Sequence, residues 1–105
     1  MTATATETYQ HLLVATDGPV ATITMNRPER RNALSLVHME ELIACFKAVG
    51  QDTTIAAVIL RGNGPAFCAG HDLSEMIGQE PGAYRHIFAV CCELMETMQA
   101  IPQPV

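Results

Sequence analysis

The residue types that are scarce in this sequence argue against several classes of protein. Tryptophan is absent, and aromatic residues make up only 5% of the chain. There are six lysines and arginines against eleven aspartates and glutamates, which gives a formal net charge of −5. Binding to nucleic acid needs a basic surface that contacts phosphates. The composition therefore argues against a nucleic-acid partner.

Long apolar runs and basic leader sequences are also missing. No run approaches the roughly 20 residues that a membrane-spanning helix needs. Residues 1–8 contain neither lysine nor arginine, so they match neither a secretory signal nor a basic transit peptide. We therefore expect a flexible leader at residues 1–8, one domain over residues 9–105, no membrane span and a cytoplasmic location.

Metal-ligand spacing is absent as well. The cysteines show no C-x-x-C pattern, and we expect reduced, mostly buried thiols and no metal site. The histidines show no ligand spacing either, and three of them are interpreted as surface or hydrogen-bonded structural residues: His11, His38 and His86. His71 differs because it lies between Gly70 and Asp72 at a predicted turn. There we expect its backbone N–H to matter more than its imidazole.

What is present predicts one globular domain. Hydrophobic residues make up 49% of the 105 residues and charged residues 16%. Two β-favouring runs, at residues 11–15 and 20–25, flank an Asp-Gly pair and predict an antiparallel hairpin. In the second run Ala21, Ile23 and Met25 alternate with Val20, Thr22 and Thr24. This alternation predicts a sheet with one buried face.

A helix and a buried strand follow the hairpin. Residues 26–32 form a loop, because Pro28 removes a backbone donor. Apolar residues at helical spacing then predict a helix with Ser35 or Asn32 as its N-cap and Gly50 just after its last turn. Residues 55–60 are continuously apolar, which is typical of a parallel strand covered on both faces. Together these elements predict a βαβ crossover.

A second helix is predicted over residues 83–100. Its apolar face comprises Tyr84, Ile87, Phe88, Cys91, Leu94, Met95, Met98 and Ile101. We interpret Met95 and Met98 as core or interface residues. Residues 102–105 read Pro-Gln-Pro-Val, and such a sequence after a helix usually introduces a further strand.

The stretch around which the chain is organised is residues 65–73. It leaves the strand at 55–60 through the loop 61–65, which is either a strand-to-strand turn or, less consistently with its glycine spacing, a phosphate-binding loop. At Gly70 the chain turns into a predicted helix start, where backbone N–H groups are unpaired. Such donors stabilise a developing negative oxygen, so the stretch is predicted to be half of an oxyanion hole.

Charged residues near this stretch allow two interpretations each. Asp72, in the first turn of the predicted helix, is either a capping residue or a general base, and capping is the commoner role there. Arg30 and Arg31 are either a solvated loop or an anchor for a phosphate-bearing ligand.

The sequence resembles the crotonase, or enoyl-CoA hydratase/isomerase, superfamily. Residues 23–35, Ile-Thr-Met-Asn-Arg-Pro-Glu-Arg-Arg-Asn-Ala-Leu-Ser, resemble its opening signature. Residues 58–62, Val-Ile-Leu-Arg-Gly, followed by residues 65–73, Pro-Ala-Phe-Cys-Ala-Gly-His-Asp-Leu, resemble its central one. The resemblance covers about residues 9–105 but only the N-terminal part of that family's domain. It implies an α/β fold, the crotonase-like ββα spiral, of which this chain supplies a hairpin, a βαβ crossover and a C-terminal helix.

The resemblance also implies a function. Family members bind acyl-CoA thioesters, take part in fatty acid metabolism, form trimers or hexamers, and need no cofactor beyond the coenzyme A of the substrate. The backbone N–H of His71 corresponds to the first of two oxyanion donors. The implied substrate-binding residues are Arg30, Arg31, Ala33, Ala69, Gly70, His71, Asp72 and Leu73.

Two departures bear on activity. The family most often has a small residue where this chain has His71. The second oxyanion donor and the catalytic glutamates of the family correspond to positions after Val105, and Glu75, Glu93 and Glu96 do not match them. We therefore expect either an enoyl-CoA hydratase/isomerase whose machinery is incomplete in these residues, or a non-catalytic acyl-CoA-binding pseudoenzyme or truncated fragment that associates with homologues.

Overall fold

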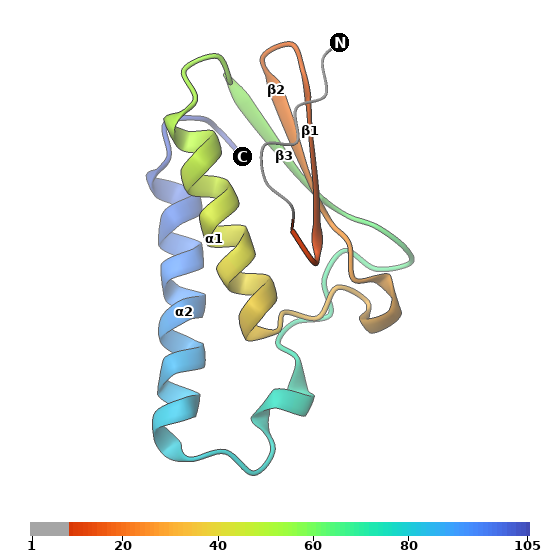
Figure 1. The fold of residues 1–105 in the computed structure, drawn as a ribbon, viewed down its shortest axis with the longest axis vertical. Coiled ribbons are helices and arrows are strands. Elements are labelled where there is room, and N and C mark those ends of the chain that lie inside the picture. The colour runs from red at the N-terminus through yellow and green to blue at the C-terminus, as the bar shows by residue number, and fades with distance from the viewer. Residues whose placement is uncertain (1–8) are drawn as a thin grey trace.

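A three-stranded sheet and two long helices make up the fold of the computed structural model, which describes residues 9–105. The predicted leader at residues 1–8 lies outside the described residues. The elements follow in the order β1 (Leu12–Asp17), β2 (Val20–Met25), η1 (Pro28–Arg30), α1 (Leu36–Gln51), β3 (Ala57–Gly62), η2 (Leu73–Met76) and α2 (Pro81–Ala100). The helices lie side by side on one side of the sheet and run in the same direction (Figure 1).

The hairpin of β1 and β2 forms as predicted. The strands pair antiparallel from Leu12 opposite Met25 to Asp17 opposite Val20, and Gly18 takes a positive φ of 58° at the turn. Ala21 and Ile23 are fully buried, and Met25 is almost so. The predicted alternation therefore places one face of β2 in the core.

β3 pairs parallel with β2 after the α1 crossover, which confirms the predicted βαβ unit. The strand occupies residues 57–62 rather than 55–60. The expectation that both of its faces are covered is wrong, because the Ile59 side chain is 52% exposed. The strand order β1-β2-β3 leaves β3 at the edge of the sheet, and α1 and α2 cover one face only.

The first turn of α1 is capped as the sequence predicts. The Ser35 hydroxyl oxygen accepts a hydrogen bond from the His38 backbone N–H at 3.1 Å. The prediction that Gly50 follows the last turn is wrong, because α1 continues to Gln51 and Asp52 takes the C-cap. A Cβ atom on Gly50 would lie 2.6 Å from Cγ2 of Ile101. Gly50 therefore allows close packing instead of ending the helix.

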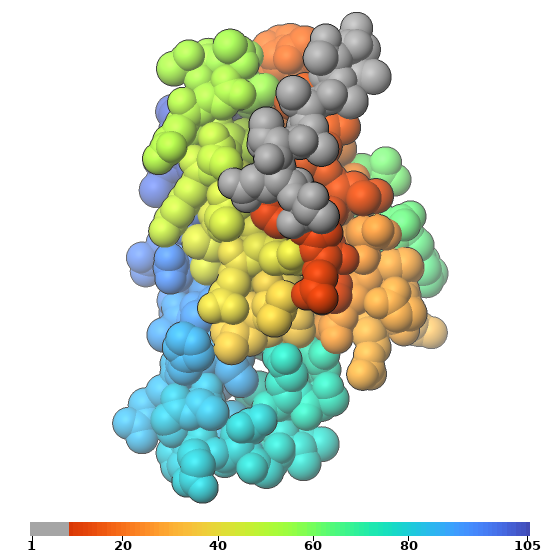
Figure 2. Space-filling view, in the orientation of Figure 1, coloured from red at the N-terminus to blue at the C-terminus, as the bar shows by residue number. Residues whose placement is uncertain are grey.

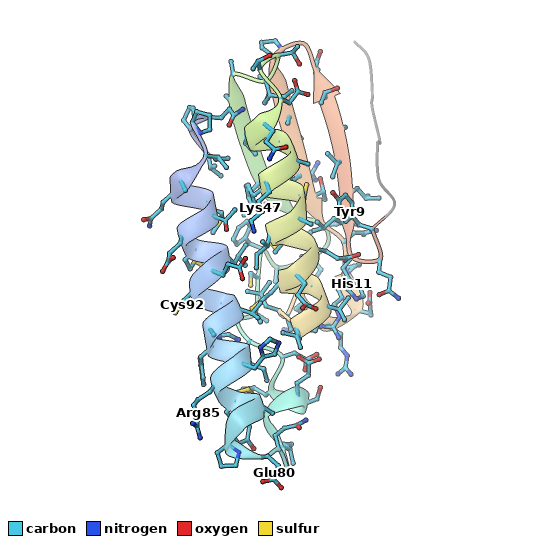
Figure 3. The ribbon with its side chains drawn as sticks, turned by 60° about the vertical axis from the view of Figure 1, so that its left-hand side comes forward. Tyr9, His11, Lys47, Glu80, Arg85 and Cys92 are labelled. Carbon is cyan, nitrogen blue, oxygen red and sulfur yellow. The ribbon has the colours of Figure 1, made fainter. Side chains whose placement is uncertain are left out.

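α2 starts two residues earlier than predicted, with Pro81 in its first turn. Its buried residues are Ile87, Val90, Leu94 and Thr97. Phe88 and Met95, which the predicted apolar face includes, are 49% and 42% exposed. That face is therefore wider than the surface that α2 buries here, while Arg85 and Cys92 point outward from the helix (Figure 3).

Residues 102–105 return to the start of β3. The Gln103 side-chain amide donates to the main-chain oxygens of Val49, Asp52 and Ile55. The Pro104 oxygen accepts a hydrogen bond from the Val58 N–H at 2.9 Å. The chain thus ends alongside the edge strand.

All four cysteines carry free thiols, but the expectation that they are mostly buried is wrong. Cys45 is buried, whereas Cys68 and Cys91 are half-buried and Cys92 is exposed. Burial is the main cause that raises the pKa of the Cys91 thiol. Among the described residues no helix is long and apolar enough to cross a membrane.

Candidate functional site

The loop between β2 and α1 is bent by two consecutive left-handed residues. Arg31 and Asn32 have φ values of 53° and 56°, and Arg31 ends the short helix η1 by donating its N–H to the Pro28 oxygen. Asparagine tolerates this conformation better than most residues. The bend turns the Asn32 side chain into the protein, where it is fully buried.

Asn32 joins this loop to the segment that follows β3. Its side-chain Nδ2 donates to the Asn63 oxygen at 3.0 Å and to the Ala66 oxygen at 2.9 Å. Its Oδ1 accepts from the Arg27 N–H at 2.8 Å. A Cβ atom on Gly62 would lie 2.9 Å from this Nδ2 and 2.5 Å from the Phe67 oxygen. The close approach of the two segments therefore requires glycine at position 62.

A single parallel β-bridge, between Leu34 and His71, aligns residues 69–73 with the loop. The Leu34 N–H donates to the Gly70 oxygen at 2.7 Å, and the Leu34 oxygen accepts from the Asp72 N–H at 2.9 Å. The Ala69 N–H donates to the Arg31 oxygen at 3.0 Å. In this register Gly70 and Asp72, on either side of His71, make the hydrogen bonds to Leu34. Within residues 9–105 the His71 N–H has no hydrogen-bond partner.

Asp72 is a capping residue and half of an ion pair. Its Oδ1 accepts from the Ser74 N–H at 3.0 Å and from the Ser74 hydroxyl at 2.6 Å, at the start of η2. Its Oδ2 lies 2.9 Å from Nη2 of Arg27. The Ser74 hydroxyl above all, and then the Arg27 guanidinium, hold the pKa of this carboxyl below its ordinary range. The capping interpretation of Asp72 is thus confirmed.

The structure brings the predicted substrate-binding residues together on two adjacent segments. Arg30, Arg31, Ala69 and Gly70 are exposed, and Ala33 is half-buried. Leu73 is 73% exposed, whereas the Asp72 side chain is buried. Their contact with coenzyme A stays a prediction. The loop 61–65, interpreted as a strand-to-strand turn, leads from β3 into residues 65–72, where an isolated bridge at His71 takes the place of a second strand.

The His71 side chain packs edge-on against Phe88 of α2, with the ring centroids 5.5 Å apart. Its Nδ1 is buried and has no partner among the described residues. The His71 imidazole is therefore held against α2 by a ring contact.

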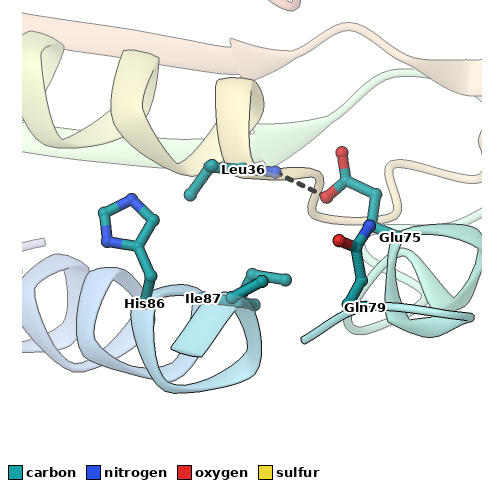
Figure 4. A pocket seen from close by; sticks show the side chains of 6 residues that line it. Leu36, Glu75, Gln79, His86 and Ile87 are labelled. Atoms are coloured by element: carbon teal, nitrogen blue, oxygen red, sulfur yellow. Dashed lines mark hydrogen bonds between the residues drawn. The ribbon is translucent and has the colours of Figure 1, made fainter. Parts of the chain in front are cut away.

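A small pocket of about 170 Å³ lies between the start of α1, η2 and α2. Glu75 and His86 face it from opposite sides (Figure 4). The Glu75 Oε1 accepts a hydrogen bond from the Leu36 N–H at 2.9 Å. This carboxylate therefore satisfies a donor at the helix N-terminus.

Residues 70–85, in cyan, form the end of the molecule below α1 (Figure 2).

A larger apolar cavity of about 320 Å³ opens further along α2. Its lining comprises Met25, Leu34, Leu42, Leu60, Phe67, Cys68, Leu94, Met95 and Met98. It borders the edge strand β3, and Phe67 at its rim is 56% exposed.

Two residues of the site, Arg27 and Asn32, have roles that were not predicted from the sequence. Both lie in the predicted loop, and their partners at Asp72, Asn63 and Ala66 are more than 30 positions away. A signal was present, because an asparagine after an arginine pair in a proline-containing loop is a candidate for positive φ. The expectation for His38 was also wrong in part: the residue is fully buried, and only one ring nitrogen has a partner.

Comparison with known proteins identifies relatives of this chain. The family model described as Enoyl-CoA hydratase/isomerase matches residues 15–105. A relative named Probable enoyl-CoA hydratase from Rhizobium meliloti is 49% identical over 70 residues, which are 67% of this chain and 27% of that protein. The 1,2-epoxyphenylacetyl-CoA isomerase of Escherichia coli is 34% identical over 90 residues, covering 82% of this chain and 34% of the enzyme.

Solved structures of enoyl-CoA hydratases have the same fold as this chain. An enoyl-CoA hydratase from Mycobacterium smegmatis superposes with a TM-score of 0.87 at 40% identity, over 90% of this chain and 38% of that one. Pseudomonas aeruginosa AtuE gives a TM-score of 0.85, also at 40% identity. This likeness confirms the predicted crotonase-type α/β fold. The chain spans only about a quarter to two fifths of the length of these relatives. It belongs to the enoyl-CoA hydratase/isomerase family.

Proposed function

We propose that this chain is the acyl-CoA-binding part of an enoyl-CoA hydratase/isomerase, and that the thioester oxygen accepts a hydrogen bond from the His71 backbone N–H. The observation that carries the proposal is the absence of any partner for that N–H among residues 9–105, although Ala69 and Asp72 beside it are bonded. A donor fixed before the substrate arrives stabilises the enolate-like oxygen without a reorganisation cost.

The charges around His71 support the proposal. An unpaired carboxylate at Asp72 would repel a developing oxyanion, but Arg27 neutralises it at 2.9 Å. Arg30 and Arg31 are exposed on the adjacent loop, where they can meet the phosphates of coenzyme A. No separate cofactor is needed, since coenzyme A enters with the substrate.

Residues 1–105 alone are expected to bind and barely to turn over. One oxyanion donor contributes about 2.7–4 kcal/mol of transition-state stabilisation, and general acid–base catalysis a further factor of about 10²–10⁴. In the proposal the second donor and the catalytic glutamates come from positions after Val105. The whole protein then acts in the cytoplasm, in fatty acid metabolism, as a trimer or hexamer.

Amide NMR tests the binding step directly. Acetyl-CoA differs from coenzyme A only in the acetyl group that replaces the thiol hydrogen, so both should shift the amides of Arg31, Ala69 and Gly70. Only acetyl-CoA should shift the His71 amide strongly downfield, with Gly18 at the distant hairpin turn as the unaffected reference. Equal His71 shifts with both ligands, or none at millimolar concentration, would contradict the proposal.

A second candidate is a non-catalytic acyl-CoA-binding protein or fragment that associates with homologues. The open apolar cavity beside β3 favours it, because Leu60, Phe67 and Met95 line a space that side chains of another polypeptide can fill. Calorimetry with acyl-CoA, enoyl-CoA turnover and sedimentation separate the two. Binding without hydration, together with complex formation with a full-length relative, supports the second candidate.

A further inference from the structure

His38 is a histidine buried inside the first turn of α1, with only one of its ring nitrogens bonded. Its side chain is fully buried. The Nδ1 lies 3.3 Å from the Ala33 oxygen, and the Nε2 is buried with no partner among the described residues. Because a carbonyl oxygen only accepts, Nδ1 must carry the proton. The bare Nε2 then needs no donor, so the arrangement fits one neutral tautomer.

The groups that face His38 disfavour a second proton. The His11 ring lies 5.6 Å away at an interplanar angle of 55°, from the segment before β1. Arg27 approaches from the loop after β2, and its Nη1 donates to the Ala33 oxygen at 2.9 Å. Glu41, the acidic group nearby on α1, accepts the backbone N–H groups of Gln10 and His11. His11 lies beside the first half of α1 (Figure 3).

Burial is the largest cause that lowers the pKa of His38, and the nearby His11 and Arg27 lower it further. The Ala33 hydrogen bond and Glu41 act in the opposite direction. The net effect is a histidine that stays neutral below its ordinary value of 6.5. Protonation keeps the Nδ1–H but adds an N–H at Nε2, where the described residues offer no acceptor. The charged ring is then expected to leave its buried site and to give up the Ala33 oxygen.

The carbonyl that His38 holds lies at the junction of the two site segments. Ala33 O accepts from His38 and from Arg27, and Arg27 continues to Asp72 at 2.9 Å. The next residue, Leu34, bonds to both sides of His71 through the Gly70 oxygen and the Asp72 N–H. The orientation of the His71 N–H therefore depends on where Ala33 is fixed.

We propose that His38 is a positioning residue whose neutral imidazole fixes the Ala33 carbonyl, and that its protonation releases the loop 30–33 from residues 69–73. Three hydrogen bonds between these segments should then open together, namely those donated by Leu34, Ala69 and Asp72. The consequence for coenzyme A affinity rests on the proposed function, whereas the release of the loop does not.

The first test needs no ligand. Nitrogen-15 imidazole spectra should show the Nδ1–H tautomer for His38. From about pH 8 down to the pH at which circular dichroism first detects unfolding, hydrogen exchange of the Leu34, Ala69 and Asp72 amides, corrected for intrinsic rates, should accelerate together while the Ile23 amide in β2 does not. An Nε2–H tautomer, or protection that is unchanged over this range, overturns the proposal.

Variants separate positioning from bulk structure. His38→Asn keeps a donor near the Nδ1 position without titrating, so protection should become independent of pH. His38→Leu fills the site without a donor, and protection of the three amides should fall at every pH. His86→Asn is the matched control and should behave as the parent chain. If a variant fails to fold by circular dichroism, the parent's tautomer and exchange data still decide.

A binding experiment with coenzyme A tests the link between His38 and ligand affinity. The affinity of coenzyme A for the parent chain should weaken about tenfold on acidification, because the binding-competent fraction falls, and by clearly less in His38→Asn, which shares any titration of the ligand. Equal losses in both overturn the link between His38 and binding. If no chain binds coenzyme A at any pH, the proposed function fails while the exchange data still test the release of the loop.

Discussion

The Arg27 guanidinium and the Asp72 carboxylate form an ion pair of 2.9 Å in which the side chains are only 12% and 7% exposed. The pair joins the loop after β2 to the segment that carries His71. Because both groups are largely out of water, removing one leaves a charge that is poorly solvated.

We expect Arg27→Met to destabilise the fold by about 3 kcal/mol, since Asp72 keeps its Ser74 bonds but loses its counter-charge. Urea unfolding measures the change. Arg30→Met is the matched control, because Arg30 is exposed, and it should change stability by less than about 0.5 kcal/mol. Similar losses in both variants would show that the ion pair contributes little.

Asn32 has two roles that variants can separate: its side chain makes hydrogen bonds, and its backbone adopts a left-handed conformation. Asn32→Ala should cost about 3 kcal/mol or more, because two buried carbonyls and the Arg27 N–H lose a partner. Asn32→Gly loses the same bonds but adopts the positive φ of 56° without strain. It should therefore be less damaging by about 1 kcal/mol. If the two variants unfold at the same urea concentration, backbone strain is not a factor there.

Gly62→Ala should destabilise by about 3 kcal/mol, because the new Cβ would meet the Phe67 oxygen at 2.5 Å. Gly82→Ala in the first turn of α2 provides the comparison, since nothing lies within 4 Å of its Cβ position. That change should stay within about 1 kcal/mol and can stabilise the helix. Thermal unfolding of both variants checks the contrast, and a neutral Gly62→Ala would mean that residues 66–67 move freely.

Acid should weaken the fold through Asp72. The folded pKa lies below the ordinary value of 3.8, so the unfolded chain binds the proton more readily. This stabilisation is fully present above that ordinary value and is lost as the pH falls through the lowered folded value. Urea unfolding from neutral pH to about pH 2 should show a steeper acid loss in the parent than in Asp72→Asn. Asp17→Asn, at the exposed hairpin turn, should keep the parent's slope.

Ser35→Ala should cost about 1 kcal/mol, because the hydroxyl that accepts from the His38 N–H caps α1. Amide exchange at His38 should accelerate more than at Phe46 in the middle of the helix. Ser74→Ala tests the shorter η2 instead, where the capping oxygen is that of Asp72. It should cost more stability at neutral pH than in acid, because Ser74 is the first cause of the lowered Asp72 pKa and its hydroxyl stabilises the ionised carboxylate.

Local pattern was sufficient for the elements themselves. The hairpin, the Ser35 cap, the βαβ order and α2 were all predicted, because turn residues and apolar periodicity act over a few positions. The predictions that were wrong concern a helix end and the exposure of a strand residue, both of which depend on tertiary packing. Gly50 lies inside α1, where Ile101 packs closely against it, and Ile59 is exposed because it lies on the sheet face that α1 and α2 leave uncovered.

The family, the order of its two motifs and the candidate site at residues 30–33 and 69–73 could all be inferred from the residues in order along the chain. How those positions contact one another follows from the fold. Asn32 reaches Ala66 across 34 positions, Arg27 pairs with Asp72, and the Leu34 bridge leaves the His71 N–H without a partner in residues 9–105. Such contacts depend on the path of the chain between them, which no local periodicity encodes.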